Sequence, residues 1–211
     1  KNYNGYLQTD GYSVYDTFAR RKGITAMGCM AHARRYFEKA LSNDRERAEF
    51  ALSKIQDLYQ IERSLREQNS SADEIVQRRR AEALPILTEL DNWMKSNLHH
   101  VLQTSPIGQA ICYALPRWDS LSVYIEHADL LLDNNLIENA IRPVAIGRKN
   151  YLFAGSHEGA KRAAMIYAFM SSCKMNGVNP QEWFADILIR IADTKTSQLR
   201  NLLPDRWNNA E

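Results

Sequence analysis

The sequence has few cysteines, no long apolar run and no export signal, and each shortage excludes a class of protein. Its three cysteines are odd in number and widely separated, so they form no disulfide framework and suit a reducing cytosol. No apolar run approaches the ~20 residues that a membrane-spanning helix needs. The first ten residues lack the basic and apolar segments of a signal peptide. We therefore expect a cytoplasmic protein without membrane contact.

Several catalytic motifs are absent as well. The sequence contains neither the serine elbow of the Ser-His-Asp hydrolases nor a glycine-rich phosphate loop. Cys29 and His32 have a Cys-x-x-His spacing, but zinc needs two more thiols or imidazoles, and Cys112 and Cys173 are isolated. The pattern favours a buried cysteine and a histidine at a helix start. It also leaves open a position for His32 near a site at the sheet edge.

The formal net charge of +2 is too small to indicate a nucleic-acid binder, but the charges are unevenly distributed. Residues 117–138 contain five acids and one base, a balance of −4, whereas residues 142–162 contain five bases and one acid, a balance of +4. An acidic segment followed by a basic one suits a site that holds cations beside a polyanion. Two solvated helix faces are the alternative.

Apolar spacing predicts a small α/β layer near the amino end. Residues 5–9 and 24–30 are typical of strands, and each is followed by a helix, the second at 31–41. Strands and helices that alternate at this spacing favour parallel strands. The predicted inner face of the first helix consists of Tyr12, Val14, Tyr15 and Phe18.

The rest of the chain is predicted to be helical. Residues 42 to about 128 contain long charged helices joined by short loops, which is typical of an antiparallel helical subdomain. Pro85 is expected to kink or split one of them. Asp133 and Asn134 form a good amino-terminal cap for the next helix, which Pro143 is expected to bend or end. The final segment is expected to dock through its leucines and Trp207.

Two carboxylates lie at positions suited to metal chemistry. Asp10 follows a predicted strand, at the sheet edge where the ligand sites of α/β proteins collect, and an ordinary Asp-Gly turn is the alternative. Glu138 lies near the start of a helix, where a surface residue that interacts with the helix dipole is the alternative. Together they could hold Mg²⁺ or Mn²⁺ for an in-line displacement at phosphorus, a reaction that normally uses three or more carboxylates.

Extended blocks of the sequence carry a family resemblance. The chain resembles the insertion-sequence-66 transposases of bacteria in LQTDGYSVYD, GCMAHARRYFEKAL, DNNLIENAIRPVAIGRKNYLFAGSHEGAKRAAMIY, CKMNGVNPQEWFADIL and the terminal LLPDRW. These blocks occur in the expected order over nearly the whole chain. The DNN…EN…IRP…GRKN block is far more specific than any single carboxylate.

The resemblance implies an α/β (α+β) fold with a ribonuclease H-like core, incomplete at the amino end and interrupted by a large all-helical insertion. The implied segments are the first part of the core at 1–41, the insertion at 42–130, the remainder of the core at 131–192 and a carboxyl-terminal tail element at 193–211. In the family's catalytic Asp-Asp-Glu (DDE) triad, the second Asp falls on Asp10 and the Glu on Glu138. These two residues would bind Mg²⁺ or Mn²⁺.

The resemblance implies that the protein binds DNA, both the terminal inverted repeats of the element and the target DNA. A homo-oligomer and accessory proteins of the element are further possible partners. The implied location is the nucleoid of a bacterial cell. Arg142, Arg148 and Lys149 are the implied phosphate contacts. Arg34 and Arg35 either face DNA or solvate their helix.

One departure from the family concerns the triad. Its first Asp should lie on a strand well before Asp10, and nine residues precede Asp10 here. We therefore expect these 211 residues to be an inactive part of a phosphoryl-transfer enzyme, with an exposed sheet edge that favours self-association. A non-catalytic DNA-binding or oligomerising remnant of a decayed transposase is the alternative, and a generic ribonuclease H-like nuclease is a third interpretation.

Overall fold

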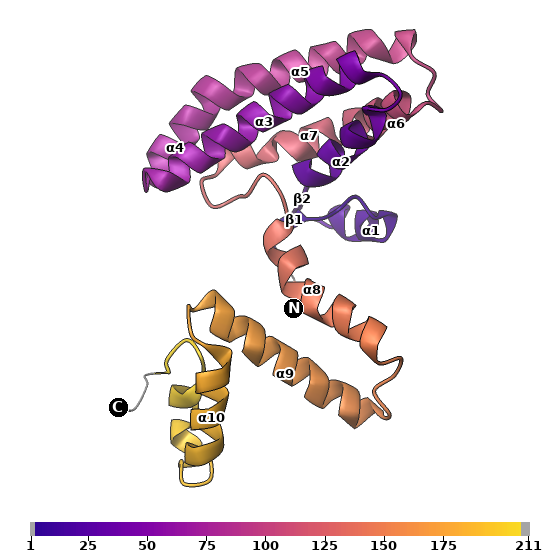
Figure 1. Cartoon of the computed structure of the whole chain (residues 1–211). Helices are drawn as coiled ribbons and strands as arrows, with labels where there is room; N and C mark the ends of the chain where they lie inside the picture. Colours follow the sequence, from indigo (N-terminus) through magenta and orange to yellow (C-terminus); the bar gives the residue numbers. More distant parts are fainter. Residues whose placement is uncertain (1–2, 208–211) are drawn as a thin grey trace. The chain divides into compact units, whose positions relative to one another are not determined.

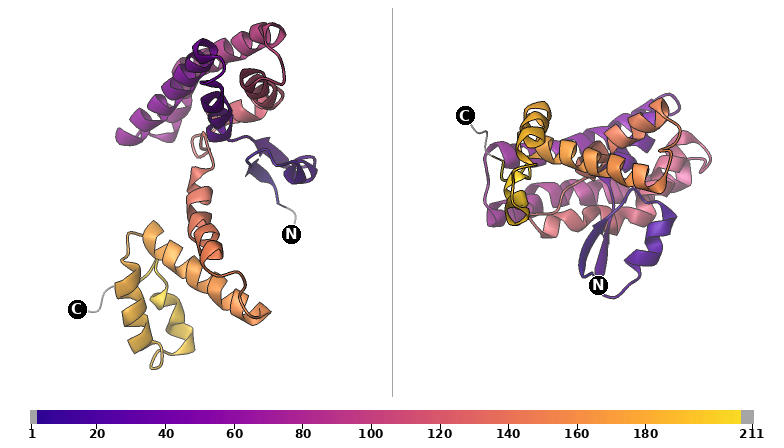
Figure 2. Two further views of the ribbon diagram at one scale, coloured as in Figure 1. Left: turned by 45° about the vertical axis from the view of Figure 1, so that its right-hand side comes forward. Right: turned by 90° about the horizontal axis from the view of Figure 1, so that it is seen from below.

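A computed structural model describes residues 3–207 of the chain. The chain divides into two compact units, residues 1–136 and residues 137–211, which are described separately below (Figures 1 and 2). The expected four-segment division follows the family resemblance rather than compactness, and it stays a prediction. Within residues 3–207, none of the helices could span a membrane.

The first unit contains a two-stranded parallel sheet within its described residues. Strand β1 (Gly5–Gln8) pairs with β2 (Ile24–Met27), with Gly5 opposite Ile24 and Gln8 opposite Met27. A 3₁₀ turn (Ser13–Tyr15) and the short helix α1 (Asp16–Ala19) connect them, as Figure 2 shows. The predicted parallel strands are confirmed. The second is shorter than expected, because the Gly28 N–H donates to the Ser120 carbonyl and a helix begins at Met30.

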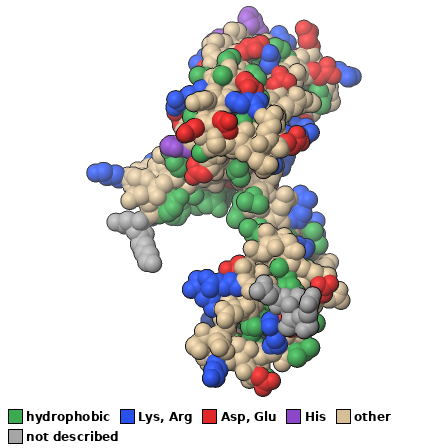
Figure 3. Space-filling view, turned by 90° about the vertical axis from the view of Figure 1, so that its left-hand side faces the viewer, with side chains coloured by type: hydrophobic (Ala, Val, Ile, Leu, Met, Phe, Trp, Pro, Cys, Tyr) green, Lys and Arg blue, Asp and Glu red, His purple; other side chains and the backbone are tan. Residues whose placement is uncertain are grey.

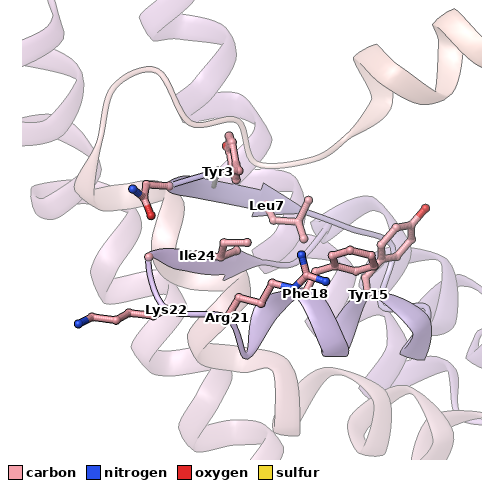
Figure 4. Close-up of a pocket in the computed structure, with 9 residues that line it drawn as sticks. Tyr3, Leu7, Tyr15, Phe18, Arg21, Lys22 and Ile24 are labelled. Carbon is pink, nitrogen blue, oxygen red and sulfur yellow. The ribbon is translucent and has the colours of Figure 1, made fainter. Parts of the chain in front are cut away.

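One face of this small sheet is open. The side chains of Leu7 and Ile24 line a pocket of about 810 Å³ with Tyr15 of the 3₁₀ turn and Phe18 of α1 (Figure 4). The predicted inner face of the first helix is therefore wrong as a buried face, because its four residues are all exposed: Tyr12, Val14, Tyr15 and Phe18. The helical spacing was correct, but the structure describes no element that covers this side.

From Met30 to Glu126 every regular element is helical. The main helices are α2 (Met30–Ala40), α3 (Arg45–Glu67), α4 (Ala72–Arg78), α5 (Leu84–Asn97), α6 (Pro106–Ala114) and α7 (Trp118–Ser122). Polar caps define several starts, since Asp44 accepts from the Arg47 N–H and Ser71 forms a capping box with Glu74. In α2, Ala33, Phe37 and Ala40 are fully buried, because this helix packs between α3 and α6.

Pro85 splits a long helix, as predicted. Proline has no N–H to donate to the carbonyl four residues earlier, and a π-helical turn (Arg79–Ala83) separates α4 from α5 just before it. Arg79, at the start of this turn, is 2% exposed although it stands in a run of three arginines. The break in the helix thus coincides with a buried cation.

The second unit is helical throughout its described residues. It contains α8 (Asn135–Asn150), whose first two residues lie in the first unit, then α9 (His157–Met175), α10 (Pro180–Arg190) and a 3₁₀ turn (Thr196–Leu202). Of the two outcomes expected at Pro143, a bend or an end of the helix, the end is wrong, because α8 continues to Asn150 with Pro143 inside it. The docked tail is confirmed: the Trp183 indole donates to the Leu202 carbonyl at 2.9 Å and the Trp207 indole to Asp186 Oδ2 at 2.7 Å.

Candidate functional site

Asp10 lies just beyond the carboxyl end of β1. The Thr9 N–H extends the sheet ladder by donating to the Met27 carbonyl at 3.0 Å, and the chain then turns at Gly11, whose φ is +85°. Asp10 Oδ1 accepts a hydrogen bond from the Tyr12 N–H at 2.9 Å. The side chain is exposed. The turn therefore fixes the carboxylate at the strand end while leaving it accessible to a cation.

Tyr113 of α6 holds the Asp10 backbone, and Arg117 packs against Tyr113. The Tyr113 hydroxyl donates to the Asp10 carbonyl at 2.8 Å, and the Arg117 guanidinium lies 4.6 Å from the centre of the Tyr113 ring. A Cβ at Gly11 would come within 3.0 Å of Arg117 Nε and Tyr113 Oη. Burial raises the pKa of Tyr113, which keeps the hydroxyl protonated as a donor. The sequence analysis did not identify either residue. The one signal in the sequence was the spacing of four positions between Tyr113 and Arg117, and it does not connect them to Asp10.

Asp133 ends the segment that leads into α8. Its Oδ2 accepts from the Tyr59 hydroxyl at 2.7 Å and from Asn135 Nδ2 at 2.8 Å, and its Oδ1 accepts from the Asn135 N–H at 3.0 Å. Burial, together with the hydrogen bond to Asp133, raises the pKa of Tyr59. The carboxylate is thus committed to the helix start, in agreement with its predicted role at the cap.

Glu138 lies in the first turn of α8 and is partly buried. It belongs to the second unit and Asp10 to the first, so the pairing of the two carboxylates stays a prediction. Among residues 3–207, no three or more His, Cys, Asp or Glu side chains gather as a metal site. The two carboxylates offer the oxygen ligands that Mg²⁺ and Mn²⁺ prefer. Octahedral coordination of either ion needs more oxygen ligands than two carboxylates supply.

The Cys-x-x-His pair has the environment expected of structural residues. Cys29 is 1% exposed and directly precedes α2, and His32 lies in the first turn of that helix. Burial raises the pKa of the Cys29 thiol, which disfavours the thiolate that zinc requires. The interpretation of a buried cysteine and a helix-start histidine is confirmed.

The predicted DNA-binding residues are exposed. Arg142, Arg148 and Lys149 project from α8, and Arg148 lies at an apolar groove of about 460 Å³ between α8 and α9. Arg34 forms an exposed ion pair with Glu38 at 3.0 Å on α2, and Arg35 is exposed beside it. On the face drawn in Figure 3, acidic and basic side chains of the first unit are interspersed. The basic run on α8 is therefore the clearer candidate for a phosphate contact.

Comparison with known proteins identifies the family. Residues 1–162 match the family described as Transposase IS66 family, and residues 169–204 match the IS66 C-terminal element. No solved structure matches the chain.

Three uncharacterized proteins of Sinorhizobium fredii are also similar. Protein y4hP is 34% identical over 99% of this chain and 40% of its own length. Protein y4jD is 33% identical over 98% of this chain and 42% of its own length, and y4qI is 32% identical over 98% and 39%. The chain thus spans about two fifths of the length of these relatives. Because the two family matches follow one another along most of the sequence, the chain belongs to the IS66 family of transposases.

Proposed function

We propose that the full-length protein cleaves and joins DNA at the ends of a bacterial insertion sequence, and that Asp10 and Glu138 supply two of its metal-binding carboxylates. The observation that carries this proposal is the position of Asp10 in a transposase family member. Its carboxylate is exposed, held by a turn and located at the carboxyl end of a parallel strand. That end of the strands is where α/β proteins bind their ligands.

A ribonuclease H-like core is the fold that we infer for the complete protein. The parallel pair of β1 and β2, each followed by a helix, supports it. Parallel sheets are normally covered on both faces, and the open apolar pocket beside Leu7 and Ile24 is a surface that further elements of a longer protein would cover. The helices from α3 to α7 would then be an insertion within that core.

The proposed role of this chain is to bind the divalent ions and to orient the carboxylates that hold them. Divalent ions bound at such carboxylates activate a water or a DNA 3′-hydroxyl and stabilise the leaving oxygen. Asp10 and Glu138 would supply the anionic oxygens for those ions. Tyr113 would fix the backbone at Asp10 through its hydrogen bond to the carbonyl, so that the carboxylate keeps one direction.

The proposed substrates are the terminal inverted repeats and the target DNA. Arg142, Arg148 and Lys149 would contact phosphates beside the carboxylates, with Arg34 and Arg35 as a second, weaker set because Arg34 already pairs with Glu38. Phosphate contacts of this kind fix the position of a duplex without reading its sequence. A homo-oligomer and accessory proteins of the element remain part of the proposal.

The proposed function is tested by DNA cleavage. The full-length protein is expected to cut a duplex that carries the element's terminal repeat when Mg²⁺ or Mn²⁺ is present, and to stop cutting when the ions are chelated. The 211-residue polypeptide alone should leave the same duplex intact, because it presents two carboxylates of the three that the reaction needs. Failure of the full-length protein to cleave the duplex in both Mg²⁺ and Mn²⁺ would contradict the proposed function. Cutting by the polypeptide that depends on Asp10 would contradict its assignment as inactive.

The basic residues of α8 are tested by salt dependence. Replacing Arg142, Arg148 and Lys149 by Gln in the full-length protein should weaken binding to all duplexes alike. It should also reduce the slope of log affinity against log salt by roughly 2 to 3, since each lost phosphate contact contributes about 0.9. The matched control is Arg45→Gln, an arginine on α3 whose side chain is 79% exposed. Fluorescence anisotropy at several salt concentrations measures the slope, and an unchanged slope would exclude these residues as phosphate contacts.

A further inference from the structure

The buried Arg79 uses every N–H of its guanidinium. Nε and Nη2 donate to the two carboxylate oxygens of Glu62 on α3 at 2.8 and 2.7 Å. Nη1 donates to the carbonyls of Tyr124 and His127, each at 2.7 Å, and Nη2 also donates to the carbonyl of Leu130 at 3.0 Å. One cation therefore ties the segment 124–130 to α3 and to the π-helical turn.

The next three residues of the chain are held one by one. The Leu131 carbonyl accepts from Gln8 Nε2 at 2.9 Å, and Gln8 is the last residue of β1, two positions before Asp10. The Leu132 carbonyl accepts from the N–H of Met30, the first residue of α2, at 3.1 Å. Asp133 accepts from the Tyr59 hydroxyl of α3 at 2.7 Å. Each of residues 130–133 thus has a hydrogen-bond partner in a different element of the first unit.

These hydrogen bonds fix the geometry of the segment as well as contributing to stability. A buried ion pair can often be replaced by apolar residues without loss of stability. Burial of the Arg79–Glu62 pair therefore does not by itself show that its role is to stabilise the fold. What five directed donors add is geometry, because a guanidinium fork fixes the acceptors in both distance and angle. Three of the five acceptors are backbone carbonyls of the segment that leads to Asn135, the first residue of α8.

We propose that Arg79, Tyr59 and Gln8 are positioning residues that hold the first residue of the Glu138 helix on the same scaffold as Asp10. The inference rests on the proposed function, because the position of α8 matters for catalysis only if Glu138 is a metal ligand. The helices between β2 and α8 then contribute to the reaction by positioning α8. They fix the start of the helix that carries a catalytic carboxylate.

The test combines hydrogen exchange of the 211-residue chain with cleavage by the full-length protein. Tyr59→Phe removes one hydroxyl and keeps the ring, and Arg79→Lys keeps the charge but loses the fork. Both should accelerate amide exchange in residues 131–138 by about tenfold or more, as expected when a hydrogen bond to a charged group is lost. Both should also slow cleavage about tenfold and raise the metal concentration needed for half-maximal rate, since a misplaced ligand weakens metal binding.

The matched control is Arg80→Lys, next in sequence, whose ion pair with Glu126 is exposed. It should change neither exchange nor metal dependence. A purely structural role would lower the unfolding midpoint without moving the metal dependence, and that result in both variants would overturn the proposal. Unchanged exchange in residues 131–138 would overturn it as well. Intact DNA with the wild-type protein would instead contradict the proposed function, and the exchange comparison alone would then decide whether these bonds hold the start of α8.

Discussion

Replacing Asp10 by Asn, or Glu138 by Gln, in the full-length protein is expected to reduce the rate of DNA cleavage by at least about a thousandfold, which corresponds to the several kcal/mol that bound metal ions contribute to transition-state stabilisation. Each change keeps the size of the side chain and removes its charge. Because Asp10 is exposed and Glu138 is partly buried near a helix start, neither change should unfold the protein. DNA affinity measured without metal should change little or increase.

Matched acids near each carboxylate provide the controls for this prediction. Asp16→Asn alters an exposed acid in the first turn of α1, and Glu158→Gln alters an exposed acid paired with Lys161 in the first turn of α9. Both should cleave at close to the wild-type rate in a single-turnover assay. A rate within tenfold of wild type for Asp10→Asn or Glu138→Gln would remove that residue from the catalytic set.

Arg79→Ala is expected to lower the free energy of unfolding by about 3–5 kcal/mol, the usual cost of removing one partner of a buried ion pair. The change leaves the Glu62 carboxylate buried without its cation and removes the donor from three backbone carbonyls. Urea unfolding of the 211-residue chain, followed by circular dichroism, measures the loss. A destabilisation below about 1 kcal/mol, which is the range of an exposed pair, would contradict the account of Arg79.

Two further variants separate charge from packing at Arg79. The double replacement Arg79→Met with Glu62→Leu removes both charges, so it should be less destabilising than Arg79→Ala alone. It should not restore wild-type stability, because the carbonyls of Tyr124, His127 and Leu130 still lack their donor. Arg80→Ala breaks the exposed pair with Glu126 and should cost less than about 1 kcal/mol.

Local signals in the sequence predicted many of the strands and helices. Apolar spacing located β1, the beginning of β2 and the long helices, and the split at Pro85 followed from the missing N–H of proline. The polar residues at Asp133 and Asn134 marked the start of α8. These features depend on neighbours within a few residues, which is why periodicity and caps were sufficient to find them.

Contacts between distant residues could not be predicted in the same way. Arg79 stands in an Arg-Arg-Arg run that is typical of a solvated helix face, and its burial depends on the turn before Pro85 and on carbonyls about 50 positions away. The hydrogen bond from Tyr113 to the Asp10 carbonyl spans 103 positions. The open face beside Tyr15 and Phe18 was also missed, because helical spacing indicates which side is apolar but not whether another element covers it.

The candidate site shows the same division. The position of Asp10 at the end of a parallel strand followed from the strand pattern and the Asp-Gly turn. Its position in the chain made Asp10 a candidate metal ligand together with Glu138, but the assignment of both to one catalytic triad came from the family resemblance. Binding of one metal site by both carboxylates is the central claim, and it is open to a direct measurement.

A change of metal preference provides that measurement. Asp10→Cys and Glu138→Cys place a thiolate where Mg²⁺ requires oxygen, so both variants of the full-length protein should lose cleavage in Mg²⁺. Because thiolates bind softer ions better, cleavage should return at least partly in Mn²⁺ or Cd²⁺, whereas the corresponding Ala variants should stay inactive in every ion. Equal inactivity of the Cys and Ala variants in all ions, or full activity of a Cys variant in Mg²⁺, would contradict metal binding by that carboxylate.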